Sequence, residues 1–186
     1  MGFNRGFKLY DDSLLGAEIY PTQLTDSSAT WRTMAAPFIQ SSYHSSALLL
    51  SDASVLLSDD YIDHSVAAAA QHRVPVFYPP YFFQGPQPVI NYAPKNVVWG
   101  QTFKLVTDRN VMASVTLFSP AAITQGNDMH QRAVRLPIQQ RPAGGVYAAV
   151  PPPRALVPPN YYLLFVVNSK GVPFIASTVK VGWRND

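Results

Sequence analysis

The sequence has 186 residues, a length that fits one domain or one domain with a small attachment. Hydrophobic residues make up 47% of it and charged residues 13%, so we expect a hydrophobic core, and the 17 prolines and 10 glycines favour strands and turns over long helices. The absence of cysteine excludes disulfides and thiolate metal sites within this sequence. The composition therefore predicts an all-β fold.

Charge divides the sequence into two unequal halves. Residues 1–87 carry four Lys/Arg and eight Asp/Glu, whereas residues 88–186 carry ten and three. This asymmetry indicates two units, of which the basic one is suited to an acidic neighbour. The basic residues are scattered singly and form no recognisable binding motif, so we expect no nucleic-acid binding.

The sequence shows neither an export signal nor a membrane span. No apolar stretch of the needed length follows a basic one near the start, as a signal peptide requires. No apolar run approaches the ~20 residues that cross a bilayer. Localisation therefore stays open at this stage.

The first half of the sequence predicts a short meander of strands. Residues 17–20 and 31–34 each give a short strand. The apolar run at 43–50 leads into the turn-forming residues 51–54, and residues 55–57 return from that turn. Two apolar runs joined by small polar residues are typical of a hairpin.

From about residue 88 the pattern becomes short strands at regular spacing, with good turn residues at 168–171. Six strands are predicted, at residues 102–106, 113–118, 132–137, 145–150, 161–168 and 175–181. Such spacing is typical of an immunoglobulin-type β-sandwich. Strand alternation predicts that Phe165 and Val167 lie on one face, with Leu164 and Val166 on the other.

Several stretches resemble, in order and spacing, the galactose oxidase / glyoxal oxidase family of copper-radical oxidases. Residues 17–31 are similar to a kelch-type propeller blade, and residues 76–81 to the join between propeller and C-terminal domain. Residues 43–45 and 48–52 resemble the family's Tyr-His-Ser…Leu-Leu-Pro-Asp-Gly segment. The run Tyr-Leu-Leu-Phe-Val-Val-Asn-Ser-Lys-Gly-Val-Pro at 162–173 matches a late strand of the C-terminal domain.

The resemblance implies a fold in two parts. A partial kelch-type propeller blade is followed by an early-set, immunoglobulin-like β-sandwich. We place the remnant blade and linker at residues 1–87 and the sandwich at residues 88–186. Ala53 takes the place of a turn glycine in the family's segment.

The resemblance also implies a copper site, in which two tyrosines and two histidines bind the metal and one tyrosine, cross-linked to cysteine, carries a radical. Tyr43 falls at one tyrosine position and His44 at one histidine position. The second histidine stands six residues before a Gln-Arg pair, which here is Gln131-Arg132, and that position is Gln125. An amide is a far weaker copper ligand than imidazole. We therefore expect Tyr43 and His44 to be vestigial copper ligands, and expect no catalytic residue and no bound cofactor.

The histidines and their neighbours also fit roles without copper. Neighbouring strand residues point to opposite faces, so Tyr43 would pack inside while His44 faces a neighbour, with a purely structural role. A register change would bring His130 to the missing ligand position. One further group of acidic residues and histidines fits either a solvated loop or an adventitious metal site. It comprises Asp59, Asp60, Asp63, His64 and His72.

The sequence and the family resemblance suggest three alternative functions. The first is a non-catalytic structural or interaction subunit derived from a copper-radical oxidase, which docks through its open blade onto a partner chain or large assembly. Trp31, Phe38 and residues 77–83 would supply the apolar contact. The alternative is the C-terminal segment of an oxidase-like copper enzyme whose other ligands lie elsewhere, with copper as cofactor and, by resemblance, secretion. The third is glycan binding by the sandwich.

Overall fold

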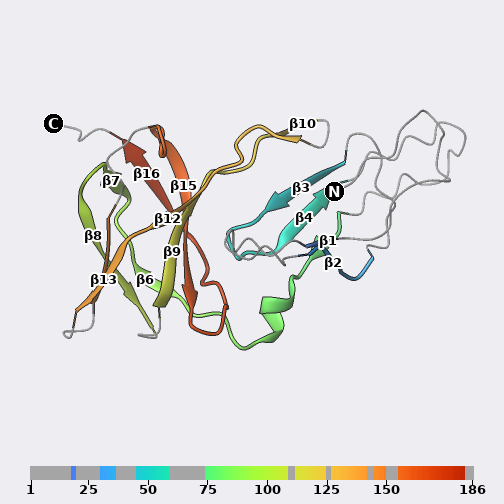
Figure 1. The fold of residues 1–186 in the computed structure, drawn as a ribbon, viewed down its shortest axis with the longest axis horizontal. Helices are drawn as coiled ribbons and strands as arrows, with labels where there is room; N and C mark the ends of the chain where they lie inside the picture. The colour runs from blue at the N-terminus through green and yellow to red at the C-terminus, as the bar shows by residue number, and fades with distance from the viewer. Residues whose placement is uncertain are drawn as a thin grey trace, which may run out of the picture. The chain divides into compact units, whose positions relative to one another are not determined.

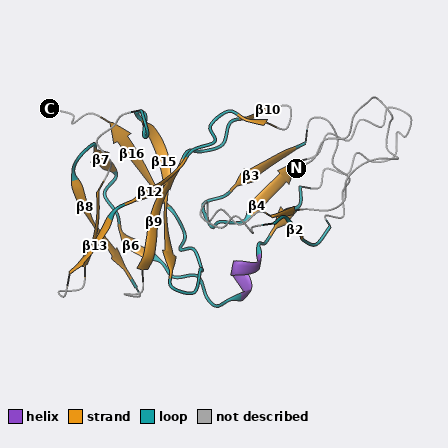
Figure 2. Cartoon of the chain, in the orientation of Figure 1, coloured by secondary structure: helices purple, strands orange, loops and turns teal. Residues whose placement is uncertain are grey.

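The computed structural model describes eight stretches of the chain: residues 18–19, 30–36, 45–58, 74–108, 112–124, 127–141, 145–149 and 155–182. Their regular structure is β-strand throughout, apart from the single 3-10 turn η1 (Pro80–Phe83) (Figure 2). The all-β class predicted from the sequence is confirmed. No helix within these stretches has the length and apolar character needed to span a membrane.

The chain separates into two compact units. The first unit comprises Met1–Leu48, Leu56–Phe77 and Ile123–Asn127. The second unit comprises Leu49–Val55, Tyr78–Ala122 and Asp128–Asp186. The tip of the first-half hairpin is therefore part of the second unit, while the boundary at residue 87 stays a prediction.

The second unit is a sandwich of two sheets (Figure 1). One sheet has five strands in the order β12 (Ala133–Leu136), β9 (Met112–Phe118), β15 (Asn160–Asn168), β16 (Ser177–Gly182), β7 (Asn96–Val98). The other has four, in the order β13 (Ile138–Arg141), β14 (Gly145–Ala149), β8 (Thr102–Thr107), β6 (Ile90–Tyr92). All neighbouring strands are antiparallel except β16 and β7, which are parallel.

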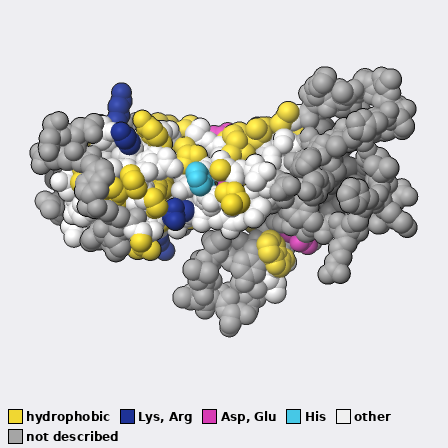
Figure 3. All heavy atoms as spheres, turned by 90° about the horizontal axis from the view of Figure 1, so that it is seen from above, with side chains coloured by type: hydrophobic (Ala, Val, Ile, Leu, Met, Phe, Trp, Pro, Cys, Tyr) yellow, Lys and Arg dark blue, Asp and Glu magenta, His cyan; other side chains and the backbone are white. Residues whose placement is uncertain are grey.

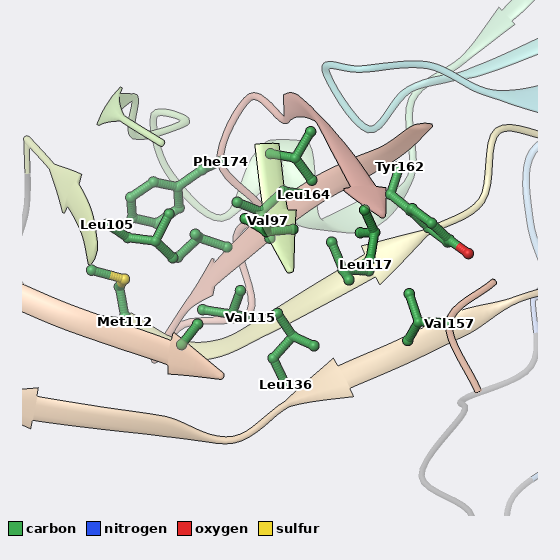
Figure 4. Packing of buried hydrophobic residues seen from close by; sticks show 14 residues of the cluster. Val97, Leu105, Met112, Val115, Leu117, Leu136, Val157, Tyr162, Leu164 and Phe174 are labelled. Carbon is green, nitrogen blue, oxygen red and sulfur yellow. The ribbon is translucent and has the colours of Figure 1, made fainter. Parts of the chain in front are cut away.

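The hydrophobic core lies between these sheets, and strand β15 contributes Tyr162, Leu164 and Val166 to it (Figure 4). Leu164 and Val166 are fully buried there against residues of the facing sheet such as Leu105. Phe165 lies outside this core cluster, and its ring meets Phe118 edge to face with centroids 5.6 Å apart. The prediction that Phe165 lies on the other face of the strand from Leu164 and Val166 is confirmed. Burial of an apolar side chain of this size stabilises the fold by about 1.5–3 kcal/mol.

All six strands predicted for the sandwich have an observed counterpart, but the sequence analysis missed three others. Strands β6 and β7 have three residues each, too few for an alternating pattern to stand out. Strand β13 begins directly after Pro137, where the predicted strand ended. Proline lacks the N–H needed for a ladder, so the chain leaves the five-stranded sheet at Pro137 and enters the four-stranded one.

The predicted turn at 168–171 is present. Gly171 has a φ of 79°, a left-handed conformation that glycine adopts without strain, and its N–H donates to the carbonyl of Asn168 (3.0 Å). The side-chain oxygen of Asn168 accepts from the N–H groups of Lys170 (2.9 Å) and Val172 (3.0 Å). This turn fixes the path of the chain towards β16.

The described strands outside the sandwich form three small sheets, of which one is the pair β10 (Ile123–Thr124) and β11 (Asn127–Asp128). Strand β1 (Glu18–Ile19) pairs with β2 (Arg32–Thr33). Strands β3 (Ser46–Leu49), β4 (Val55–Ser58) and β5 (Val76–Phe77) form a three-stranded sheet in that order. The predicted hairpin is confirmed, whereas its assignment to a kelch-type propeller blade stays a prediction.

Tyr162, near the start of β15, ties this strand to the segment before it. Its hydroxyl donates to the carbonyl of Pro158, four residues earlier, at 2.7 Å. A tyrosine bonded back to the main chain in this way is typical of immunoglobulin-type sandwiches. Burial raises the pKa of Tyr162, against opposing effects from the charge of Arg132 and from hydrogen bonds with Ser119 and Arg132.

We predict that Tyr162→Phe lowers the free energy of unfolding by about 1 kcal/mol, because it removes the hydrogen bond from the Tyr162 hydroxyl to the half-buried carbonyl of Pro158. Tyr161→Phe is the matched control, since Tyr161 is the next residue in the strand and is 56% exposed. Urea unfolding of both variants measures the difference. Equal loss in the two variants would contradict a structural role for the Tyr162 hydroxyl.

Candidate functional site

The residues at the family's copper positions, Tyr43, His44 and Gln125, lie outside the described residues, as does the group Asp59, Asp60, Asp63, His64 and His72. Tyr43 and His44 stand shortly before β3 in the sequence. Gln125 stands between the short strands β10 (Ile123–Thr124) and β11 (Asn127–Asp128), which pair with each other. The ligand assignments therefore stay predictions.

The described residues around Gln125 show how the ends of its segment are joined. The carboxylate of Asp128 accepts hydrogen bonds from the N–H groups of Ala122 (3.0 Å) and His130 (2.9 Å). The N–H of Met129 donates to the carbonyl of Ala122 (2.9 Å). Asp128 thus links the described residues on the two sides of Gln125.

His130, the alternative ligand, is exposed beside Asp128. Its Nδ1 lies 3.2 Å from the carbonyl oxygen of Pro120, so a protonated Nδ1 donates to that oxygen. Only Nε2 is then available to a metal. Within the stretches that the structure describes, no three His, Cys, Asp or Glu side chains are grouped so that they could hold a metal ion.

The tip of the β3–β4 hairpin is a tight turn with an unusual backbone. Ala53 has a φ of 69°, which costs an ordinary L-residue about 1–2 kcal/mol, and it is the one non-glycine residue with positive φ in the described ranges. Its N–H donates to the carbonyl of Leu50 (2.9 Å), and the N–H of Leu50 donates to the carbonyl of Ser54 (2.8 Å). The carboxylate of Asp52 accepts from the N–H (2.9 Å) and hydroxyl (2.6 Å) of Ser54.

This turn is held by donors from other parts of the second unit. The carbonyls of the consecutive residues Ser51–Ala53 accept, in order, from the N–H of Ala176 (2.7 Å), the side-chain amide of Gln87 (2.6 Å) and the hydroxyl of Tyr81 (2.5 Å). We call these three donors the turn clamp. The sequence analysis missed it, because Tyr81 was counted only among the aromatic residues of the join and Gln87 belongs to no motif.

The hydroxyl of Tyr81 is a much weaker acid than that of an ordinary tyrosine. Burial, and secondly the negative charge of Asp52, raise the pKa of Tyr81 from 10.0 to about 12. Both effects oppose the tyrosinate anion, so the hydroxyl stays protonated and keeps its proton for the carbonyl of Ala53.

Both basic and large aromatic side chains are exposed on the described surface. Lys95, Lys104 and Lys180 are exposed, and the Lys and Arg side chains do not gather into one patch on the face in Figure 3. Trp31 is 59% exposed and Phe83 80%. Phe38, also expected at an apolar contact, lies outside the described residues.

Comparison with known proteins identifies the class. Residues 87–181 match the family model of the galactose oxidase-like early-set domain. The solved structure of a fungal alcohol oxidase of the AA5 family, in complex with copper, superposes with a TM-score of 0.77. The match has 22% identity and covers 91% of this chain and 36% of that one, which supports the fold.

The chain belongs to the galactose oxidase-like early-set family. A WSC domain-containing protein of Arthroderma benhamiae is 30% identical over 95% of this chain and 19% of its own length. Aldehyde oxidase GLOX1 of Arabidopsis thaliana is 30% identical over 81% of this chain and 28% of its own length. Galactose oxidase of Gibberella zeae is 30% identical over 75% of this chain and 21% of its own length.

The chain thus spans between about a fifth and somewhat over a quarter of the length of these relatives. The relation to copper-radical oxidases that the motifs indicated is confirmed.

We predict that Tyr81→Phe removes part of the alkaline destabilisation of the protein. Because the pKa of Tyr81 is raised on folding, its contribution to stability is complete below pH 10 and is lost as the pH rises through about 12. Urea unfolding below pH 10 and near pH 12 should show a smaller drop for the variant than for the unmodified chain.

A second variant separates the two causes of the raised pKa of Tyr81, burial and the charge of Asp52. Asp52→Asn keeps an oxygen for Ser54 but removes the charge, so it should lower the pKa of Tyr81 only in part, since burial is the larger cause. Tyrosinate ultraviolet absorbance, taken as the difference from Tyr81→Phe, measures this pKa. A pKa that Asp52→Asn leaves unchanged would contradict the role of Asp52.

Proposed function

We propose that this chain is a non-catalytic structural and interaction module derived from a copper-radical oxidase. One observation carries the proposal: Gln125 stands where the family's pattern has a histidine ligand. Copper in proteins prefers imidazole donors to amides, so the substitution removes a ligand that the metal chemistry needs. The sequence itself also supplies no cysteine for a cross-link to a radical tyrosine.

The first unit is the docking element in this proposal. Its described sheets have two and three strands, and sheets this small are marginally stable unless further strands or a packed face support them. Strand β3 has β4 as its only described neighbour, which leaves an edge for another strand. The partner is a protein chain or assembly that supplies strands of the propeller type, and the acidic balance of residues 1–87 favours a neutral or basic partner surface.

A second function is favoured by a specific observation. The chain spans only 19–28% of the length of the three relatives compared above, and it retains Tyr43 and His44. In this alternative the chain is the C-terminal segment of a copper enzyme, whose remaining ligands come from another region or chain. Tyr43 and His44 would hold copper, and the metal would supply the redox chemistry.

Copper binding distinguishes the two functions. We predict that the purified chain binds Cu(II) weakly and releases no hydrogen peroxide from simple alcohols or aldehydes. Gln125→His should tighten Cu(II) binding on the order of tenfold, because it adds an imidazole ligand, and Tyr43→Phe should reverse part of that gain. Calorimetry and the nitrogen hyperfine pattern in Cu(II) electron paramagnetic resonance measure both effects.

Gln101→His is the matched control, because Gln101 is an exposed residue between β7 and β8 and the added histidine has no predicted partner there. Stoichiometric, tight copper in the unmodified chain, or peroxide release above that of Tyr43→Phe, would contradict the non-catalytic function. An equal gain from both added histidines would contradict the ligand position assigned to Gln125.

Partner binding is tested on the chain alone. We predict that it self-associates or purifies with a partner, and that the interface removes roughly 1,200–2,000 Å² from water, the usual size for a specific complex. Light scattering gives the mass in solution, and hydrogen exchange gives the protection of β3 and β4. A monodisperse monomer whose β3 and β4 amides are as protected as those of β15 needs no partner and would count against docking.

A further inference from the structure

The hydrogen bonds of the turn clamp to the hairpin tip all end on its main chain. Its three hydrogen bonds from the rest of the second unit all end on carbonyl oxygens of Ser51–Ala53. The side-chain hydrogen bonds of Asp52 stay within the turn, where its carboxylate accepts from Ser54. These three hydrogen bonds therefore depend on the path of the backbone at the tip, while the carboxylate of Asp52 acts on Tyr81 only through its charge.

The donors are themselves held in place. The amide nitrogen of Gln87 that donates to Asp52 also lies 3.3 Å from the carbonyl oxygen of Pro173, so it bridges two segments. The ring of Tyr81 stacks on Phe82 at a centroid distance of 5.4 Å. The third donor is the main-chain N–H of Ala176, which only a substitution by proline would remove.

The backbone that these donors meet is one that few residues adopt. Ala53 is 4% exposed and Ser54 fully buried, so this part of the tip packs inside the second unit. The positive φ at Ala53 orients the carbonyls of the turn. Glycine adopts this conformation freely, alanine with some strain, and a β-branched residue hardly at all.

We propose that Tyr81, Gln87 and the N–H of Ala176 form a turn-recognition site of the second unit, with the tip Leu49–Val55 as its occupant. The site selects a tight turn with a positive φ at the position of Ala53. Its hydrogen bonds do not depend on the side chains of the turn. Because β3 runs into this tip, the site also fixes the end of the strand that follows Tyr43 and His44 in the sequence. This recognition does not depend on the proposed function.

Hydrogen exchange on the full chain tests the site, with two amides as reporters. The N–H of Ala176 reports the clamp, because it donates to Ser51, and the N–H of Leu50 reports the turn itself, because it donates to Ser54. Gln87→Glu turns a donor into an acceptor that faces two carbonyls, and should speed exchange at Ala176 roughly tenfold or more. Gln101→Glu, the same change at an exposed residue, should leave it unaltered.

Variants of the turn separate backbone from side-chain recognition. Ser51→Ala keeps the carbonyl and should leave exchange at Ala176 unchanged. Ala53→Val cannot keep the positive φ and should speed exchange at both Ala176 and Leu50. Exchange at Leu164, in the centre of the sandwich, shows in each case that the core stays folded.

Two results would overturn the proposal. One is exchange at Ala176 that matches the unmodified chain in both Gln87→Glu and Tyr81→Phe. The other is Ser51→Ala speeding exchange as much as Gln87→Glu, since the recognition would then involve a side chain. If Gln87→Glu fails to fold, Tyr81→Phe, which removes one hydroxyl, decides the question. None of these measurements involves copper or a partner, so their outcome is separable from that of the proposed function.

Discussion

The alternation of side chains along β15 is the constraint on which the rest of the second unit depends. This strand lies between β9 and β16 in the five-stranded sheet. Its inward residues Tyr162, Leu164 and Val166 are completely buried in the core. A shift of one residue would turn that whole set away from the core, so the register of β15 also fixes the registers of its two neighbours. The hydroxyl of Tyr162 then secures the start of the strand on Pro158.

The other end of β15 leads to the hairpin tip. Asn168 and Gly171 form the turn that reverses the chain, and the residues beyond it supply two parts of the turn-recognition site. The carbonyl of Pro173 holds the amide of Gln87, and the N–H of Ala176 reaches Ser51. The position of the tip is thus determined by the same strand that forms the centre of the core.

The hydrogen bonds that hold the hairpin tip and the residues beside Gln125 are distinct from the side chains assigned to copper. The tip is held through hydrogen bonds to its main chain, and the carboxylate of Asp128 links the described residues on the two sides of Gln125. Neither contact involves a side chain assigned to copper. A chain with this architecture can lose a histidine ligand without losing the contacts that fix the neighbouring segments. That is the physical basis for proposing a structural module in a family related to copper-radical oxidases.

The sequence by itself determined the all-β class, the strands longer than three residues with clear alternation, the hairpin with its turn at 51–54 and the turn at 168–171. These follow from local periodicity and turn chemistry, which act over a few residues. The copper positions Tyr43, His44 and Gln125 came from the family resemblance and stay predictions. Only the tertiary structure decided that Pro137 marks a change of sheet and that Gln87 binds the tip. The partners of Gln87 lie 35 and 86 residues away in the chain, and no local pattern records contacts over such separations.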